Sequence, residues 1–149
     1  MPVFLDGLGI CHVLSMDNGD TWSAPTCLSR NYVLRDQEYE VRPRIAVDSE
    51  NNLHVVFMID DYSQLSTLAY TSRAVYYARF MTDSLTWSDA IVIDEVESRD
   101  PSYTGRQPDW GNVIVDLEDR IHIVWVGAPS MQRYHTWSKD GGLTWTPRE

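Results

Sequence analysis

S-M-D-N-G-D-T-W at residues 15–22 recurs as S-K-D-G-G-L-T-W at residues 138–145. Both octapeptides read S-x-D-x-G-x-T-W, and a degenerate copy at residues 80–87 keeps the final Thr-Trp in register. The three Thr stand at positions 21, 86 and 144, so the copies are almost evenly spaced along the chain. Recurrence at such a spacing indicates stacked supersecondary units. The sequence therefore predicts a repeat protein.

The residue types of the octapeptide suit the turn of a β-hairpin. Ser and Asp oxygens accept hydrogen bonds from nearby backbone N–H groups, and Gly adopts backbone angles that other residues resist. Thr begins the returning strand, and Trp packs a large ring against the hairpin. The segments 10–14, 74–80 and 133–137 before the three copies are rich in strand formers. We expect a structural role for Ser15, Asp17, Gly19, Thr21, Trp22, Thr86, Trp87, Ser138, Asp140, Gly142, Thr144 and Trp145.

A second repeat alternates with the first. Residues 43–57 and 112–125 each read as a strand ending in Asp, a polar turn, and a strand with His in second place. Asp48 recurs as Asp116, and His54 recurs as His122. The number of positions from Asp48 to Asp116 equals that from His54 to His122, and we call this number the repeat offset. We interpret both histidines as structural. Each unit then contains four strands in the order of an antiparallel propeller blade, which predicts an all-β fold.

The S-x-D-x-G-x-T-W copies resemble the Asp-boxes, or BNR repeats, of sialidase-like β-propellers. The resemblance extends from about residue 10 to residue 145, and it implies four-stranded antiparallel blades. In that family the Asp-box lies on the outer hairpin between the third and fourth strands, away from the binding face. The motif therefore implies an architecture and leaves the activity open.

The number of expected strands gives about two to two and a half blades. We expect one partial propeller domain over residues 1–149: an outer hairpin at about 1–30, a complete blade at 41–98, and a third blade at 108–149 that lacks its last strand. Closed propellers typically have about 4–8 blades. Two arrangements stay open: a homo-oligomeric ring, with a trimer favoured, or membership of a larger propeller.

Composition excludes some classes of partner. The 149 residues carry a net charge of −10, which disfavours binding to nucleic acids and to anionic membranes. No apolar run has the length of a membrane span, and the first residues lack the features of a signal peptide, so the localisation stays open. We expect no metal and no cofactor. Cys11 and Cys27 flank the first octapeptide, and both a cross-strand disulfide and two buried thiols fit this spacing.

Charged and aromatic residues gather in segments that the blade pattern places opposite the octapeptide turns, at 29–41, 59–73, 95–107 and 127–132. Arg42 and Arg106 each come just before a proline that opens a strand, and we expect equivalent positions for them in consecutive blades. The expected ligand-binding residues are Arg42, Arg106, Tyr62 and Tyr103.

Sialidases bind the sugar carboxylate with arginines and use a tyrosine nucleophile with a glutamate and an aspartic acid. The resemblance makes Tyr39, Glu40, Asp60 and Asp61 loose catalytic counterparts, although the F/Y-R-I-P arginine motif of the family is absent. We favour a non-catalytic module that binds a glycan or another polar ligand, such as a small carboxylate-bearing molecule, on the face opposite the Asp-boxes. A sialidase-like exo-glycosidase that needs further blades and a structural scaffold are the alternatives.

Overall fold

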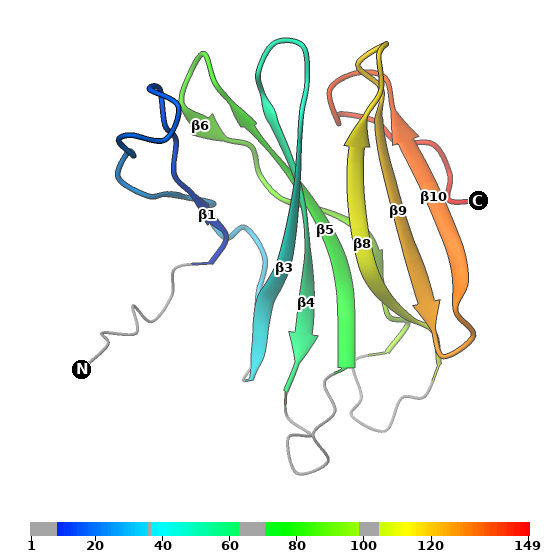
Figure 1. Cartoon of the computed structure of the whole chain (residues 1–149). Helices are drawn as coiled ribbons and strands as arrows, with labels where there is room; N and C mark the ends of the chain where they lie inside the picture. Colours follow the sequence, from blue (N-terminus) through cyan, green and yellow to red (C-terminus); the bar gives the residue numbers. More distant parts are fainter. Residues whose placement is uncertain (1–8, 36, 63–70, 99–104) are drawn as a thin grey trace.

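The computed structural model describes residues 9–35, 37–62, 71–98 and 105–149. Within these ranges the chain forms antiparallel strands and no helix, so the prediction of an all-β antiparallel fold is confirmed for them. Two sheets pack face to face, and a short hairpin lies beside the first sheet (Figure 1). None of the described residues forms a helix that could span a bilayer.

The strands divide into three groups. Sheet I has the order β3-β4-β5-β6, and β7 pairs with β5 as well; its strands are β3 (Glu38–Val47), β4 (Leu53–Asp61), β5 (Thr71–Met81), β6 (Thr86–Trp87) and β7 (Ile91–Glu95). Sheet II has the order β10-β9-β8 and consists of β8 (Gln107–Val115), β9 (Ile121–Ala128) and β10 (Gln132–Ser138). The hairpin consists of β1 (Cys11–His12) and β2 (Thr26–Cys27).

The main core lies between sheets I and II. Sheet I contributes Val56, Met58, Val75 and Tyr77, and sheet II contributes Val113, Ile121, Ile123 and Trp125. Gly111 on β8 lets the sheets approach, because a Cβ there would come within 2.9 Å of the Val56 side chain. Alternation along each strand directs these side chains inward.

A second core covers the opposite face of sheet I. Ile10 and Leu28 from the N-terminal segment pack on residues such as Phe57 of that sheet. Asn31 joins the segment to sheet I: its amide donates to the Ala90 carbonyl at 3.0 Å, and its carbonyl oxygen accepts from the Ala90 N–H at 3.2 Å. The Asn31 side chain thus pairs with this backbone as a strand would.

The first octapeptide closes its turn with side-chain oxygens. Ser15 Oγ accepts from the Gly19 N–H at 2.7 Å, and Asp17 accepts from the N–H and the hydroxyl of Thr21 at 2.8 and 2.6 Å. Trp22 Nε1 donates to the Gly19 carbonyl at 3.1 Å. The copy at 138–145 makes the same bonds between the corresponding atoms. In the degenerate copy Ser84 stands in place of Gly19, and its hydroxyl lies 2.7 Å from the hydroxyl of Thr86.

The two Asp–His hairpins are alike in detail. Asp48 Oδ1 accepts from the N–H of Asn52 at 2.8 Å, while Asp48 Oδ2 lies 3.0 Å from His54 Nε2. Asp116 makes the equivalent bonds in sheet II and lies 3.1 Å from His122 Nε2. One carboxylate in each hairpin therefore closes the turn and orients the histidine.

The chain ends differ from the sequence expectation in extent. An outer hairpin was expected over about residues 1–30, of which 1–8 lie outside the described residues, and regular strand pairing in the described part of it is limited to β1 and β2. Cys11 and Cys27 face each other there and form a disulfide, which resolves the two alternatives. At the other end, the backbones of Glu149 and His135 exchange two hydrogen bonds of 2.9 and 3.1 Å. Residues 146–149 therefore lie along the free edge of β10.

Candidate functional site

Each sheet has a β-bulge in its first strand, at corresponding positions. The register shifts between Val41 and Arg44 on β3 and between Asp109 and Asn112 on β8. Arg42 has a φ of 54° and Trp110 a φ of 52°, and the repeat offset carries Arg42 onto Trp110. Non-glycine residues in this left-handed region cost of order 1–3 kcal/mol and concentrate at functional sites. The two bulges are therefore candidate positions for a functional site.

Arg42 connects the two sheets at the bulges. Its Nη2 lies 2.5 and 2.6 Å from the two carboxylate oxygens of Asp60 on β4. Its Nη1 lies 2.8 Å from Asp109 Oδ1 on β8. Burial raises the pKa of Asp60, and the Arg42 guanidinium opposes this shift. Since two carboxylates already bind it, the Arg42 guanidinium chiefly fixes the position of the bulges.

Trp110 and Arg44 stand beside this ion pair and face solvent. The Trp110 side chain is 61% exposed. Arg44 is exposed and forms no ion pair with the described residues; its hydrogen bond to the Pro43 carbonyl is long, at 3.5 Å. A hollow of about 190 Å³ lies between them, lined by Arg42, Arg44, Met58, Trp110, Gly111 and Asn112. We call Arg42, Arg44 and Trp110 the bulge patch.

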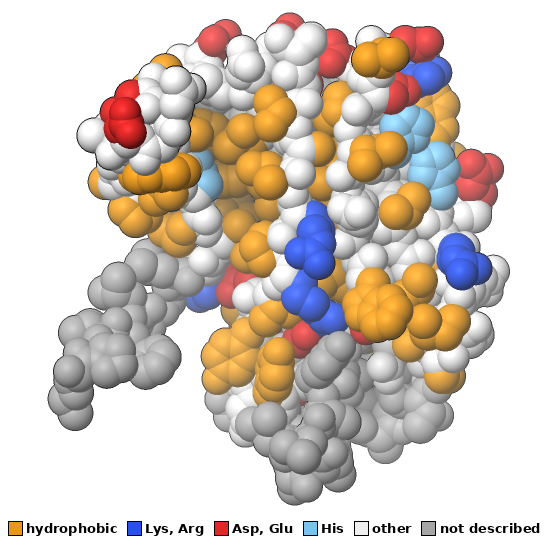
Figure 2. Space-filling model, in the orientation of Figure 1, with side chains coloured by type: hydrophobic (Ala, Val, Ile, Leu, Met, Phe, Trp, Pro, Cys, Tyr) orange, Lys and Arg blue, Asp and Glu red, His pale blue; other side chains and the backbone are white. Residues whose placement is uncertain are grey.

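The bulge patch lies on the side of the molecule that β3 presents. Figure 2 shows basic side chains in the middle of this side with large hydrophobic groups on both flanks. Tyr39, lower on β3, is 55% exposed, and the Tyr62 ring meets it edge to face at 5.8 Å. Aromatic rings and a guanidinium therefore form one solvent-facing surface.

The four catalytic candidates from the sequence do not come together. Tyr39 and Asp60 are register partners across β3 and β4, so their side chains share a face of sheet I. Glu40 and Asp61 follow them in sequence and point to the opposite face. Glu40 is bonded to Arg30 Nη2 at 2.8 Å and to the Tyr32 hydroxyl at 3.0 Å.

Asp61 is likewise paired inside the protein. Its Oδ2 accepts from Arg73 Nη2 at 2.6 Å, and both side chains are largely buried. Glu40 therefore joins β3 to the N-terminal segment and Asp61 joins β4 to β5, each through an arginine, and neither bond involves Tyr39.

Arg106 occupies a different position from the one expected. The bulge register makes Trp110 the counterpart of Arg42, so the expectation that Arg42 and Arg106 are equivalent is wrong. Arg106 binds both carboxylate oxygens of Asp94, and its guanidinium lies 5.3 Å from the centre of the Tyr134 ring. Tyr103, also expected in the site, lies outside the described residues. The sequence reasoning missed Trp110, which applying the repeat offset to Arg42 would have identified.

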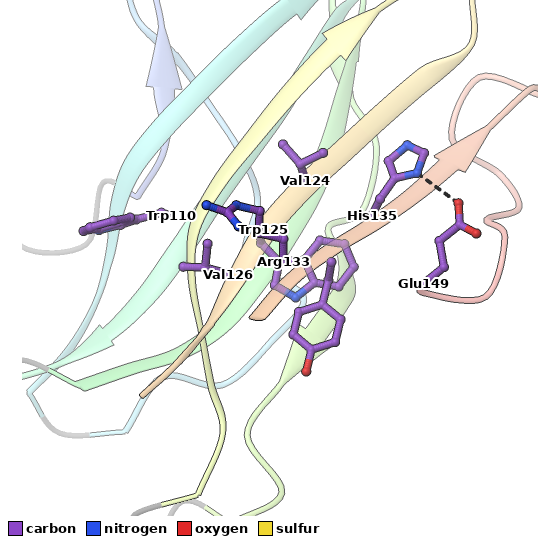
Figure 3. A pocket seen from close by; sticks show the side chains of 8 residues that line it. Trp110, Val124, Trp125, Val126, Arg133, His135 and Glu149 are labelled. Carbon is purple, nitrogen blue, oxygen red and sulfur yellow. Dashed lines mark hydrogen bonds and ion pairs between the residues drawn. The ribbon is translucent and has the colours of Figure 1, made fainter. Parts of the chain in front are cut away.

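A larger hollow of about 410 Å³ lies on the outer face of sheet II and shares Trp110 with the hollow of the bulge patch. Figure 3 shows Trp110 at one end, the hydrogen-bonded pair of His135 and Glu149 at the other, and Val124 and Val126 between them. Its lining is mainly apolar. Among the described residues, no three His, Cys, Asp or Glu side chains are placed to hold a metal ion.

No family model and no curated protein matches the chain. Solved structures do match it. One is titled Hadza microbial sialidase Hz136, with a TM-score of 0.55, 19% identity, and coverage of 89% of this chain and 29% of that one. Another is a polysaccharide lyase of family PL25, an ulvan lyase bound to -[GlcA(1-4)Rha3S]-, with a TM-score of 0.58, 16% identity, and coverage of 91% and 36%. The chain thus spans about a third of the length of these neighbours, and the likeness concerns the fold.

Proposed function

We propose that this chain is a carbohydrate-binding propeller module whose ligand lies on the bulge patch. The observation that carries the proposal is the exposed Trp110 ring and the exposed Arg44, which line one hollow at the two bulges that the Arg42–Asp109 ion pair joins. Sugar rings offer C–H faces that pack on an aromatic ring, and their hydroxyls accept hydrogen bonds from a guanidinium. The structural neighbours, whose titles name a sialidase and a polysaccharide lyase, support this proposal.

Binding without turnover is the expected behaviour. Glu40 and Asp61, two of the catalytic candidates from the sequence, are each bonded to an arginine. Asp60 is the buried acid with a raised pKa, and it lies opposite Tyr39, but Arg42 binds both of its oxygens. We therefore expect no release of a chromogenic aglycone from sialosides or related glycosides. Turnover that disappears in Asp60→Asn would favour the glycosidase alternative.

A glycan array followed by calorimetry tests the binding proposal. Trp110→Ala is expected to weaken binding of an array hit by about 1–3 kcal/mol in free energy, in the range for loss of a stacked aromatic ring. Arg44→Ala is expected to weaken it as well. Trp22→Ala is the matched control, because the Trp22 side chain is equally exposed, at 62%, but belongs to the first octapeptide turn. Equal losses in Trp22→Ala and Trp110→Ala, or no glycan hit at all, would rule out the bulge patch.

A further inference from the structure

The outer face of sheet II is apolar, and its counterpart on sheet I is buried. The register pairs Val124 with Asn112 and Val56 with Arg44, so the repeat offset carries Val56 onto Val124. Val124 is 47% exposed, whereas Val56 is fully buried. What buries Val56 is sheet II itself. The outer face of sheet II therefore carries the same kind of packing surface without a cover.

Two further positions repeat this contrast. Val126 corresponds to Met58, which is fully buried between the sheets, and Val126 is only half-buried. Ile114, on the same outer face, is 59% exposed. Arg133 and the His135–Glu149 pair lie on this face toward β10, at its edge. An apolar centre with a polar border is the composition of a protein–protein interface.

Sheet I presents the complementary apolar surface, and this surface is exposed to solvent as well. Ile45 on β3 corresponds to Val113 on β8, yet Ile45 is 56% exposed and Val113 only 4%. Val47 is 53% exposed, while its counterpart Val115 packs into the core between the sheets. The N-terminal segment covers the part of this face around Phe57 and leaves the β3 part uncovered.

We propose that the outer face of sheet II in one copy of this chain docks on the β3 face of sheet I in a second copy. Inside the chain the same two kinds of face already pack together: Val56 and Met58 of sheet I lie against Val113 of sheet II. One copy therefore carries an open surface of each kind, and the contact joins different surfaces on its two partners. Such a head-to-tail contact either closes a ring or extends a chain of copies. This inference does not rest on the proposed carbohydrate binding, although Trp110 lines both the hollow of the bulge patch and the hollow on the outer face of sheet II, so the contact borders the bulge patch.

Light scattering coupled to size exclusion, with analytical ultracentrifugation, tests the proposal on the full chain. The wild-type chain is expected to form an oligomer. Val124→Glu and Ile45→Glu each place an unpaired charge in the contact and are expected to raise the dissociation constant by about thirtyfold or more. Both side chains are exposed, so the variants retain the fold, which circular dichroism checks. Leu117→Glu is the control, because Leu117 is fully exposed in the turn before β9.

Mixing the two variants identifies the mode of contact. The Ile45→Glu chain keeps its sheet II face, and the Val124→Glu chain keeps its β3 face. An equimolar mixture is therefore expected to form a heterodimer, although each variant alone is monomeric. If the wild-type chain is still monomeric at a concentration about 100 times a micromolar dissociation constant, the proposal is wrong. Loss of assembly in Val124→Glu but not in Ile45→Glu would also overturn it, because the contact would then join two sheet II faces.

Discussion

Gly111 provides a sharp test of the packing between the sheets. An added Cβ would lie 2.9 Å from Val56 Cγ1, 3.2 Å from Met58 Sδ and 3.3 Å from Val75 Cγ1. Val56, Met58 and Val75 are all fully buried, so none of them can move into solvent. The φ of Gly111 is not in the left-handed region that favours glycine, so in the folded state Gly111→Ala changes only the steric fit.

The expected loss of stability follows from two opposing effects. Adding a methyl group to a filled core costs about 1–3 kcal/mol. Replacing glycine by alanine restricts the unfolded chain and offsets about 0.4–1 kcal/mol of this cost. We therefore expect Gly111→Ala to lower the free energy of unfolding by about 1–2 kcal/mol and the melting temperature by about 2–8 °C.

Urea unfolding followed by tryptophan fluorescence measures this change, since Trp125 lies in the same core. Val56→Ala removes the closest atom, so Gly111→Ala should cost at least about 0.5 kcal/mol less in that background. If Gly111→Ala unfolds at the same or a higher urea concentration than the wild type, the sheets do not approach at the bulge and the reasoning fails.

Three further predictions concern the turns and the hairpin. Bonds from Thr144 and Ser138 lower the pKa of Asp140 to about 2, below its unfolded value of 3.8, so its contribution is present above pH 3.8 and is lost as the pH falls toward 2. Asp140→Asn should reduce the pH dependence of the urea midpoint in this range, and an unchanged slope would contradict the role of this carboxylate. Burial lowers the pKa of His54, so stability should fall as the pH drops below 6.5, and His54→Gln should flatten that slope between about pH 7.5 and 5.5. Replacing Cys11 and Cys27 by serine should lower the free energy of unfolding by about 3 kcal/mol, the loop-entropy value for a closed loop of this length, and equal melting curves for the variant and the wild type would argue against it.

The hairpins were predictable because their chemistry is local. Asp48 and His54 lie six positions apart, and so do Asp116 and His122, so turn, strand and register are all encoded in a short stretch. The structure places the carboxylate and the imidazole of each pair at hydrogen-bond distance, 3.0 and 3.1 Å. Turn residues act on their own backbone, and a single sequence is enough to recognise them.

The site was harder to predict because it depends on contacts between distant residues. The β-bulges add one residue to a strand without a clear mark in the side-chain pattern, so the left-handed positions of Arg42 and Trp110 were not expected. Residues 38–41 were expected in a connection but belong to β3. Asp61 was a catalytic candidate on sequence grounds, and only the pairing of β4 with β5 brings Arg73 to it.

The bond between Asn31 and Ala90 joins residues that are 59 positions apart in the chain. Ribosomes add about 5–20 residues per second, so Asn31 is made about 3–12 seconds before its partner. During that interval Ile10 and Leu28, which end up buried against sheet I, have only an incomplete sheet to cover. The nascent chain therefore carries an exposed apolar segment during that interval, and a holding chaperone that binds short apolar segments would meet it before sheet I is complete.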